Sequence, residues 1–223
     1  MKRCTLAGLT LIEILVVTGI LALLGSLALP AVGHARAVAR DVECRANLRQ
    51  WGVGLAMYMN DYSGYIPRRG QGSRELGRLE RSEDWFNCLP PYLDELPYRD
   101  LVEQGKRPRA GDKSVFICPS ATDAGGRYFL PYAMNKFLCT WLDADQVNMM
   151  NVPEPSAVVF LADAPGPYSS TAPSKDRSSV QPRHEGSANV LFLDGHVRSF
   201  TGEYLGCGRG DRMQPDVHWQ ILD

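Results

Sequence analysis

The chain has 223 residues, of which 44% are hydrophobic and 22% are charged. This is the composition of a globular protein and argues against a wholly disordered, collagen-like or multi-span membrane protein. Its 24 Lys and Arg against 25 Asp and Glu leave a formal net charge of -1, so no excess of positive charge indicates a nucleic-acid partner, and none is expected.

An apolar segment covers residues 9–32 and contains one ionisable side chain, Glu13. At about 1.5 Å per residue, a helix of this length reaches about 36 Å and can cross a hydrocarbon core of about 30 Å. Lys2 and Arg3 precede the segment. By the positive-inside rule they predict a cytoplasmic N-terminus and an exported remainder.

Two other interpretations of this segment stay open. A cleaved secretory signal also has a basic start, and residues 35–37 (ARA) resemble its cleavage site. A plain signal anchor is the second. Both leave Glu13 unexplained, because a carboxylate in the hydrocarbon core costs several kcal/mol unless it finds a partner.

The residues around Glu13 read GLTLIEIL over positions 8–15. This segment resembles the processing motif of type IV prepilins and of type II secretion pseudopilins. The resemblance implies that a prepilin peptidase cleaves after Gly8 and methylates Leu9, where Phe is usual. It also implies an assembly role for Glu13, paired with the N-terminal amine of a neighbouring subunit, and for Pro30, at the family's helix-kinking proline. The implied partners are the prepilin peptidase, other pilin-like subunits and the inner membrane.

Apolar residues continue at helical spacing beyond the membrane segment, at Cys44, Leu48, Trp51 and Leu55, followed by Tyr58 or Met59 and by Tyr62. One helix from residue 9 to about residue 60 is therefore predicted. The predicted organisation is a leader (1–8), a transmembrane helix (9–33), a helix extension (34–62) and an exported head domain (63–223).

Strand-like runs follow at 114–117, 158–162, 188–193 and 196–200, and a Pro- and Ser-rich loop covers 165–187. The predicted fold class is α+β. A long N-terminal helix, transmembrane in its first half, is expected to pack on a small antiparallel sheet, as in the lollipop shape of pilins.

The dipeptide Asp194-Gly195 separates the last two runs and predicts a type I′ hairpin in which Leu193 lies opposite His196. His184 stands ten residues before Asp194. This His-x9-Asp-Gly spacing resembles a C-terminal element of a large group of pilin-like proteins, and residues 44–50 and 116–120 look similar to that group as well. We expect a hydrogen bond between His184 and Asp194 at this element.

A second acidic residue, Asp163, ends the strand most suited to lie beside 190–193. We expect His184, Asp194 and Asp163 to form a structural clamp, in which a carboxylate orients the imidazole. As metal ligands, the same three residues would make an incomplete shell of two oxygens and one nitrogen, so no metal is predicted there.

Cysteine usage is consistent with export. Cleavage of the leader would remove Cys4. Five cysteines remain in the mature chain: Cys44, Cys88, Cys118, Cys139 and Cys207. In an oxidising compartment they allow up to two disulfides, and the alternative that some remain buried thiols stays open. No pair has C-x-x-C spacing, which argues against a zinc ribbon.

The sequence contains no H-E-x-x-H, G-x-S-x-G or P-loop motif, so no catalytic residue, enzymatic activity or cofactor is predicted. The favoured function is that of a structural pilin-like subunit of a pilus or type II pseudopilus. The protein would be single-pass in the cytoplasmic (inner) membrane, with a periplasmic or extracellular head. The alternative is a membrane-anchored, exported ligand-binding or metal-dependent enzyme domain that uses His184, Asp163 and Asp194.

Overall fold

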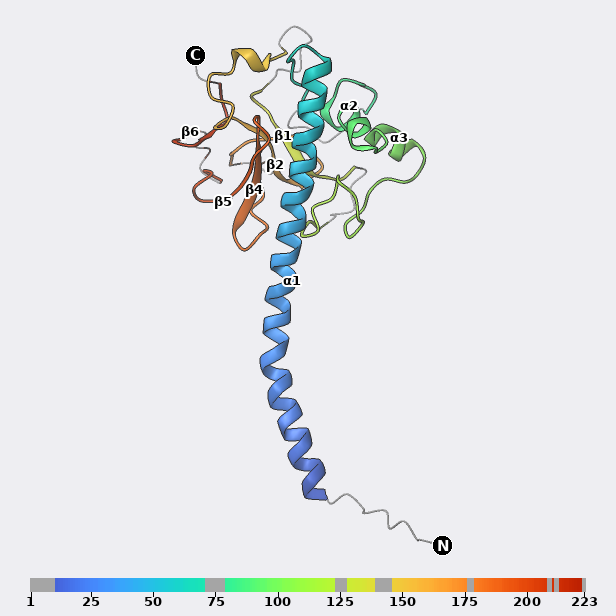
Figure 1. The fold of residues 1–223 in the computed structure, drawn as a ribbon, viewed down its shortest axis with the longest axis vertical. Coiled ribbons are helices and arrows are strands. Elements are labelled where there is room, and N and C mark those ends of the chain that lie inside the picture. The colour runs from blue at the N-terminus through green and yellow to red at the C-terminus, as the bar shows by residue number, and fades with distance from the viewer. Residues whose placement is uncertain are drawn as a thin grey trace. The chain divides into compact units, whose positions relative to one another are not determined.

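The computed structural model describes residues 11–70, 79–122, 128–138, 146–175, 179–207, 210 and 213–221. The predicted processing residues, Gly8 and Leu9, lie outside these ranges. Internal contacts divide the chain into two compact units, Met1–Ala39 and Arg40–Asp223, and we call the second unit the head. Helix α1 (Leu11–Asp61) supplies residues to both units, which confirms the predicted long N-terminal helix (Figure 1).

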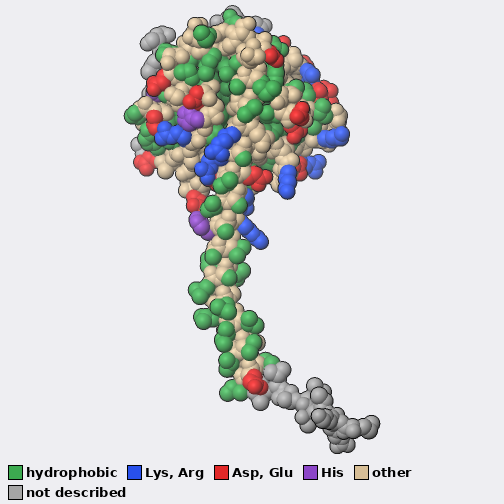
Figure 2. All heavy atoms as spheres, in the orientation of Figure 1, with side chains coloured by type: hydrophobic (Ala, Val, Ile, Leu, Met, Phe, Trp, Pro, Cys, Tyr) green, Lys and Arg blue, Asp and Glu red, His purple; other side chains and the backbone are tan. Residues whose placement is uncertain are grey.

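In the first unit, apolar side chains are exposed around the circumference of α1, and Figure 2 shows one face of them. Among the described residues it is the one helix long and apolar enough to cross a membrane. The hydroxyl groups of Thr18 and Ser26 donate to carbonyl oxygens of the preceding turn, at 3.0 Å to Ile14 O and 2.7 Å to Leu23 O. Hydroxyls bonded in this way need no water, so they are compatible with a lipid environment. Pro30 lies within the helix, as predicted.

In the head, the predicted apolar stripe of α1 is the centre of the hydrophobic core. Cys44, Leu48, Trp51 and Leu55 are fully buried and Tyr58 is nearly so, whereas Tyr62 is exposed. These positions recur every three or four residues because that spacing returns to one face of an α-helix. The other elements, in chain order, are the helices α2 (Trp85–Cys88), η1 (Pro90–Leu93), α3 (Tyr98–Glu103) and η2 (Met149–Asn151), and the strands β1 (Leu130–Asn135), β2 (Val159–Gly166), β3 (Ser170–Thr171), β4 (Ser187–Phe192), β5 (Val197–Thr201), β6 (Met213–Gln214) and β7 (Val217–His218).

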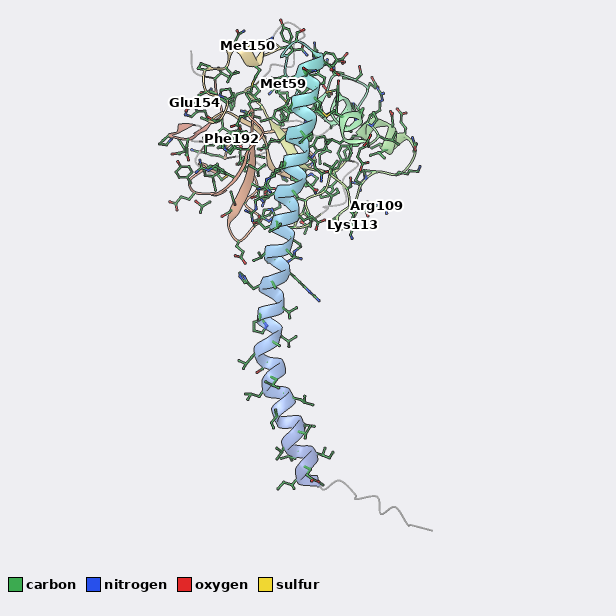
Figure 3. The ribbon with its side chains drawn as sticks, viewed as in Figure 1. Met59, Arg109, Lys113, Met150, Glu154 and Phe192 are labelled. Carbon is green, nitrogen blue, oxygen red and sulfur yellow. The ribbon has the colours of Figure 1, made fainter. Side chains whose placement is uncertain are left out.

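A five-stranded sheet has the order β3-β1-β2-β4-β5 and is antiparallel except for the short β1–β3 pair. The α+β class is thus confirmed. Along β4, alternate residues face opposite sides of the sheet. Leu191 belongs to the core that contains α1, while Val190 and Phe192 belong to a second core with Val217 and Trp219 on the other side. Phe192 is labelled in Figure 3.

Two differences from the predicted strands have clear physical causes. Residues 114–117 are a turn, because their carbonyl groups accept from α1 rather than from a strand: Trp51 Nε1 donates to Val115 O (2.9 Å) and Asn47 Nδ2 donates to Ile117 O (2.8 Å). Strand β1 was not predicted. All six of its residues are buried, so it lacks an alternating pattern, and Pro131 interrupts it.

The predicted type I′ turn at Asp194-Gly195 is wrong. The N–H of Gly195 donates to Phe192 O and the N–H of Phe192 donates to His196 O, each at 3.0 Å. Phe192 therefore lies opposite His196, in place of Leu193, and the loop has three residues. Gly195 has φ of +90° but Asp194 does not have a positive φ, so the loop is a turn that ends in one left-handed glycine.

Close approach of α1 to this hairpin explains a glycine inside the helix. A Cβ on Gly52 would lie 3.2 Å from both Cα and O of Gly195 and 3.1 Å from Leu191 Cδ1, whereas one on Gly54 would meet mainly the flexible side chain of Leu93, at 3.3 Å. Both substitutions by Ala improve helix propensity equally, by about 1 kcal/mol. Only Gly52→Ala displaces backbone.

We therefore expect Gly54→Ala to raise the free energy of unfolding by up to about 1 kcal/mol and Gly52→Ala to lower it by about 1 kcal/mol through overpacking. Chemical denaturation of the two variants beside the wild type measures the difference. Equal stabilisation by both substitutions would contradict the close approach of Gly52 to the hairpin.

Candidate metal centre

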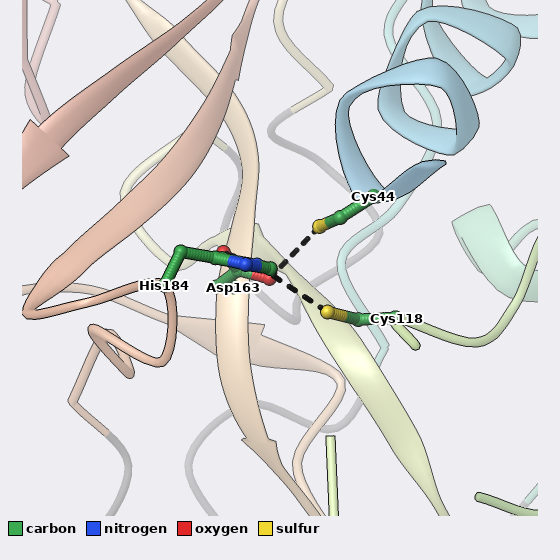
Figure 4. Close-up of side chains that lie close together, drawn as sticks. All are labelled: Cys44, Cys118, Asp163 and His184. Atoms are coloured by element: carbon green, nitrogen blue, oxygen red, sulfur yellow. Dashed lines mark hydrogen bonds and ion pairs between the residues drawn. The ribbon is translucent and has the colours of Figure 1, made fainter. Parts of the chain in front are cut away.

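Four buried side chains from four separate segments of the head point toward one another (Figure 4). They are Cys44 of α1, Cys118 of the segment between α3 and β1, Asp163 of β2 and His184 of the segment before β4. Their ligand atoms all lie within 4.8 Å of one another. Cys44, Cys118 and Asp163 are fully buried and His184 is 8% exposed, so these four residues, which we call the buried thiol cluster, are closed to solvent.

The local structure explains the positions of three of these four side chains. Cys44 begins the buried stripe of α1, and Asp163 lies two residues after Leu161 on the sheet face that contacts this stripe. His184 directly precedes a two-residue turn in which Glu185 and Gly186 both have positive φ, of 51° and 83°. The backbone groups of His184 and Ser187 exchange two hydrogen bonds of 2.9 Å across it. This is the type I′ geometry, found here at Glu185-Gly186.

The polar atoms of the cluster are in mutual contact. His184 Nε2 lies 3.3 Å from Asp163 Oδ2 and 3.4 Å from Cys118 Sγ. The other carboxylate oxygen, Asp163 Oδ1, lies 3.5 Å from Cys44 Sγ. The carboxylate therefore bridges the imidazole and one sulfur, while the imidazole bridges the carboxylate and the other sulfur.

A second layer of polar groups surrounds the cluster. His184 Nδ1, on the opposite side of the ring from the cluster, faces Asp41 Oδ1 at 3.5 Å. The backbone N–H of Asn189 donates to Asp163 Oδ2 (2.8 Å), and Arg183 Nε lies 3.9 Å from Asp163 Oδ1. The hydroxyl group of Tyr132 donates to Cys44 Sγ at 3.4 Å.

Asp41, the second acidic residue at the site, has further partners of its own. Asp41 accepts from Asn189 Nδ2 (2.8 Å) and pairs with Arg45 (2.7 Å), one helical turn along α1. The imidazole of His184 is thus held between two carboxylates, one inside the cluster and one outside it.

The electrostatics of the cluster favour one thiolate. A hydrogen bond from the Cys44 thiol to Cys118 raises the pKa of Cys44 and lowers that of Cys118, to about 6. Burial acts to lower the pKa of His184, but its hydrogen bonds to Asp163 and Cys118 outweigh burial and raise the pKa to about 10. The two thiols, the carboxylate and the imidazole of the cluster therefore share their protons, because the His184 imidazolium stabilises both the Cys118 thiolate and the Asp163 carboxylate.

The structure corrects the predicted clamp of His184, Asp163 and Asp194. His184 and Asp163 do meet, but the predicted hydrogen bond between His184 and Asp194 is wrong. His184 precedes β4 and Asp194 follows it, so the two residues lie at opposite ends of a six-residue strand. Asp194 is exposed, and its carboxylate pairs instead with His196 Nδ1 at 2.6 Å.

Cys44, Cys118 and Asp41 were not predicted as partners of His184. Each cysteine lies in one of the two segments, 44–50 and 116–120, that resemble the same group of pilin-like proteins as the His-x9-Asp-Gly element. This shared resemblance was the one feature of the sequence that could have predicted that the two cysteines lie near His184. The spacing of 66 residues between Cys118 and His184 carries no geometric information without the fold.

The family described as "Protein of unknown function (DUF1559)" matches residues 33–148, which is more than half of the chain. The chain belongs to the DUF1559 family. The DUF1559 match includes Cys44 and Cys118 but ends before Asp163 and His184, and it begins after the apolar segment. No curated protein and no solved structure matches the chain.

Proposed function

We propose that this DUF1559 protein is a membrane-anchored, exported structural subunit that resembles type IV pilins and pseudopilins. In this proposal a prepilin peptidase removes residues 1–8 and methylates Leu9. The mature subunit then assembles through its apolar helix into a pilus or a type II secretion pseudopilus. Pilin subunits act as structural parts of an assembled filament, so the proposal assigns no catalytic role to the head.

The observation that carries the proposal is the continuity of α1, which covers 51 residues without a break. Its first half exposes apolar side chains, and its second half is the centre of the head's core. A plain signal anchor needs only about 20 apolar residues and gives no reason for the same helix to continue into a folded domain. A cleaved secretory signal would discard the apolar half altogether.

Glu13 supports the same proposal. It lies in the first turn of α1, within the apolar segment. An acidic residue there is favoured by the partial positive charge of the helix N-terminus, but in lipid it still requires a cationic partner. The N-terminal amine that cleavage after Gly8 creates on a neighbouring subunit is such a cation.

The alternative, a metal-dependent enzyme, has less support. A catalytic metal keeps one coordination position open to substrate, whereas the buried thiol cluster is closed. A hollow of about 230 Å³ is lined by Ser120, Thr122, Pro165, Gln181 and Arg183. Of the groups that contact the cluster, this lining includes Arg183, but it includes none of the four cluster residues themselves.

Processing can be tested directly. Mass spectrometry of the mature protein should find Leu9 as the first residue, with one methyl group on its amine. Gly8→Val should leave the leader attached, because the peptidase motif requires a small residue before the cut. Gly25→Val is the matched control, since a side chain at Gly25 meets nothing within 4 Å, and it should be processed normally. A mature chain that starts near Val38 would instead identify a secretory signal and refute the pilin-like assignment.

A further inference from the structure

We propose that Cys44, Cys118, Asp163 and His184 bind one zinc ion in a closed, tetrahedral site that stabilises the head. The inference goes beyond the proposed function and does not depend on it, because all four ligands lie in the head. It rests on the distances within the cluster, on the chemistry of the ligands and on the groups that surround them.

Three contacts within the cluster have lengths close to those between the ligand atoms of a tetrahedral zinc site. Zinc–ligand bonds of about 2.0–2.3 Å at tetrahedral angles place sulfur about 3.6 Å from nitrogen, nitrogen about 3.3 Å from oxygen and sulfur about 3.5 Å from oxygen. The corresponding distances here are 3.4 Å from Cys118 Sγ to His184 Nε2, 3.3 Å from His184 Nε2 to Asp163 Oδ2, and 3.5 Å from Cys44 Sγ to Asp163 Oδ1. The two carboxylate contacts are made by different oxygens, and the four ligand atoms, one from each residue, lie within 4.8 Å of one another.

The ligand set selects zinc among common metals. Two thiolates and one imidazole are too soft for magnesium or calcium, which take oxygen ligands. Four protein ligands without an open position are typical of structural zinc sites.

Charge balance also favours a divalent cation. Two thiolates, one carboxylate and a neutral imidazole carry three negative charges, and a zinc ion reduces the sum to one. The guanidinium group of Arg183, with Nε 3.9 Å from Asp163 Oδ1, offsets that remaining charge. Buried charges require such compensation because they have lost their hydration.

The outer contacts are those of a metal-bound histidine. Such a histidine presents one ring nitrogen to the metal and its other N–H to a carboxylate, which fixes the tautomer and the ring orientation. Here Nε2 faces the cluster, and Nδ1 faces Asp41 Oδ1 at 3.5 Å. Asp163 is likewise held by the backbone N–H of Asn189.

A disulfide between Cys44 and Cys118 is the competing arrangement in an oxidising compartment. It would turn both sulfurs into weak acceptors, and Asp163 and His184 would then face an apolar bond in a buried site. A disulfide accounts for the proximity of two cysteines. It does not account for a carboxylate and an imidazole directed at both sulfurs.

The decisive measurement is the metal content and thiol state of the full-length protein, purified in detergent without chelators. Elemental analysis should give one zinc ion per chain. Alkylation after denaturation should find Cys44 and Cys118 as free thiols. Cobalt added to metal-free protein should give a thiolate-to-cobalt charge-transfer band and the intense visible bands of a tetrahedral site. A zinc-free protein with a Cys44–Cys118 disulfide would overturn the proposal, and so would iron or copper in place of zinc.

Variants locate the site. Cys44→Ser and Cys118→Ser should each lose the zinc, whereas Cys88→Ser, which removes a half-buried thiol outside the cluster, should retain it. Asp41→Asn keeps all four ligands and removes the negative charge that faces His184 Nδ1, although it also weakens the contacts of Asp41 with Arg45 and Asn189 outside the cluster. It should therefore fold and bind zinc about 10–100-fold more weakly. Unchanged zinc affinity in Asp41→Asn, or full zinc occupancy in Cys118→Ser, would contradict the assigned ligands. Either readout is independent of leader cleavage, so it separates this site from the proposed filament function.

Discussion

Substitution of His184 by Ala should lower the free energy of unfolding of the head by about 3–5 kcal/mol, the cost of removing one partner from a buried charged pair. In the metal-free head Asp163 is fully buried, and the protonated imidazole of His184, with Nε2 at 3.3 Å, is its nearest opposite charge. Arg183 Nε, at 3.9 Å, is a weaker substitute. In the zinc-bound head proposed above His184 is neutral, and the substitution instead removes one of the four ligands of the ion. Chemical denaturation followed by tryptophan fluorescence measures the loss, and cleavage of the leader should be unchanged.

His196→Ala is the matched control for this substitution. His196 also pairs with a carboxylate, that of Asp194, but both side chains are more than one-third exposed. Exposed pairs contribute about 0–1 kcal/mol because water screens them, so little destabilisation is expected. If His196→Ala destabilised the head as much as His184→Ala does, burial of Asp163 would not be the reason for the effect.

The His-x9-Asp-Gly spacing has a geometric explanation in this fold, although not the predicted one. The element has β4 at its centre, and each of its ends meets α1. At the first end, His184 faces Asp41 of α1. At the second end, Gly195 lies against Gly52 of α1. The two contacts on α1 are 11 residues apart, which is about 16 Å along a helix, and the six residues of β4 cover about 17–20 Å. The spacing thus matches the length of a strand that follows the helix.

Periodicity explains which parts of the fold were predictable. The helix of 51 residues and the strands β2, β4 and β5 follow from apolar residues that repeat every 3.6 residues or form short β-branched runs. Strand β1 was missed because a fully buried strand has no alternation. The type I′ turn was assigned to Asp194-Gly195, but it forms at Glu185-Gly186, and composition alone does not distinguish the two.

The candidate site was only half predictable, because its members come from four segments. Asp163 was identified because it ends a predicted strand, and His184 because of its His-x9-Asp-Gly spacing. Their meeting with Cys44 and Cys118 depends on the packing of α1 against the sheet and on the turn at residues 114–117, which is fixed by Asn47 and Trp51. No local pattern encodes these long-range contacts.

Glu13→Val should leave membrane insertion intact and abolish assembly. Insertion does not need the carboxylate, since removing a charge from an apolar segment makes transfer into lipid more favourable. In the proposed filament, assembly does need it, because the N-terminal amine of the neighbouring subunit would be left in hydrocarbon without an opposite charge. Loss of one partner of a buried pair costs about 3–5 kcal/mol, which weakens each contact between subunits by at least about a hundredfold.

The experiment compares membrane fractions with filament or pseudopilus fractions from cells that express each variant. Glu13→Gln has almost the same shape as the wild-type residue but no charge, so it should fail to assemble as well. Ile14→Val changes a neighbouring apolar side chain and should assemble normally. Normal incorporation of Glu13→Gln and Glu13→Val into filaments would refute the charge pairing, because the only property that both substitutions remove is the negative charge within the apolar half of α1.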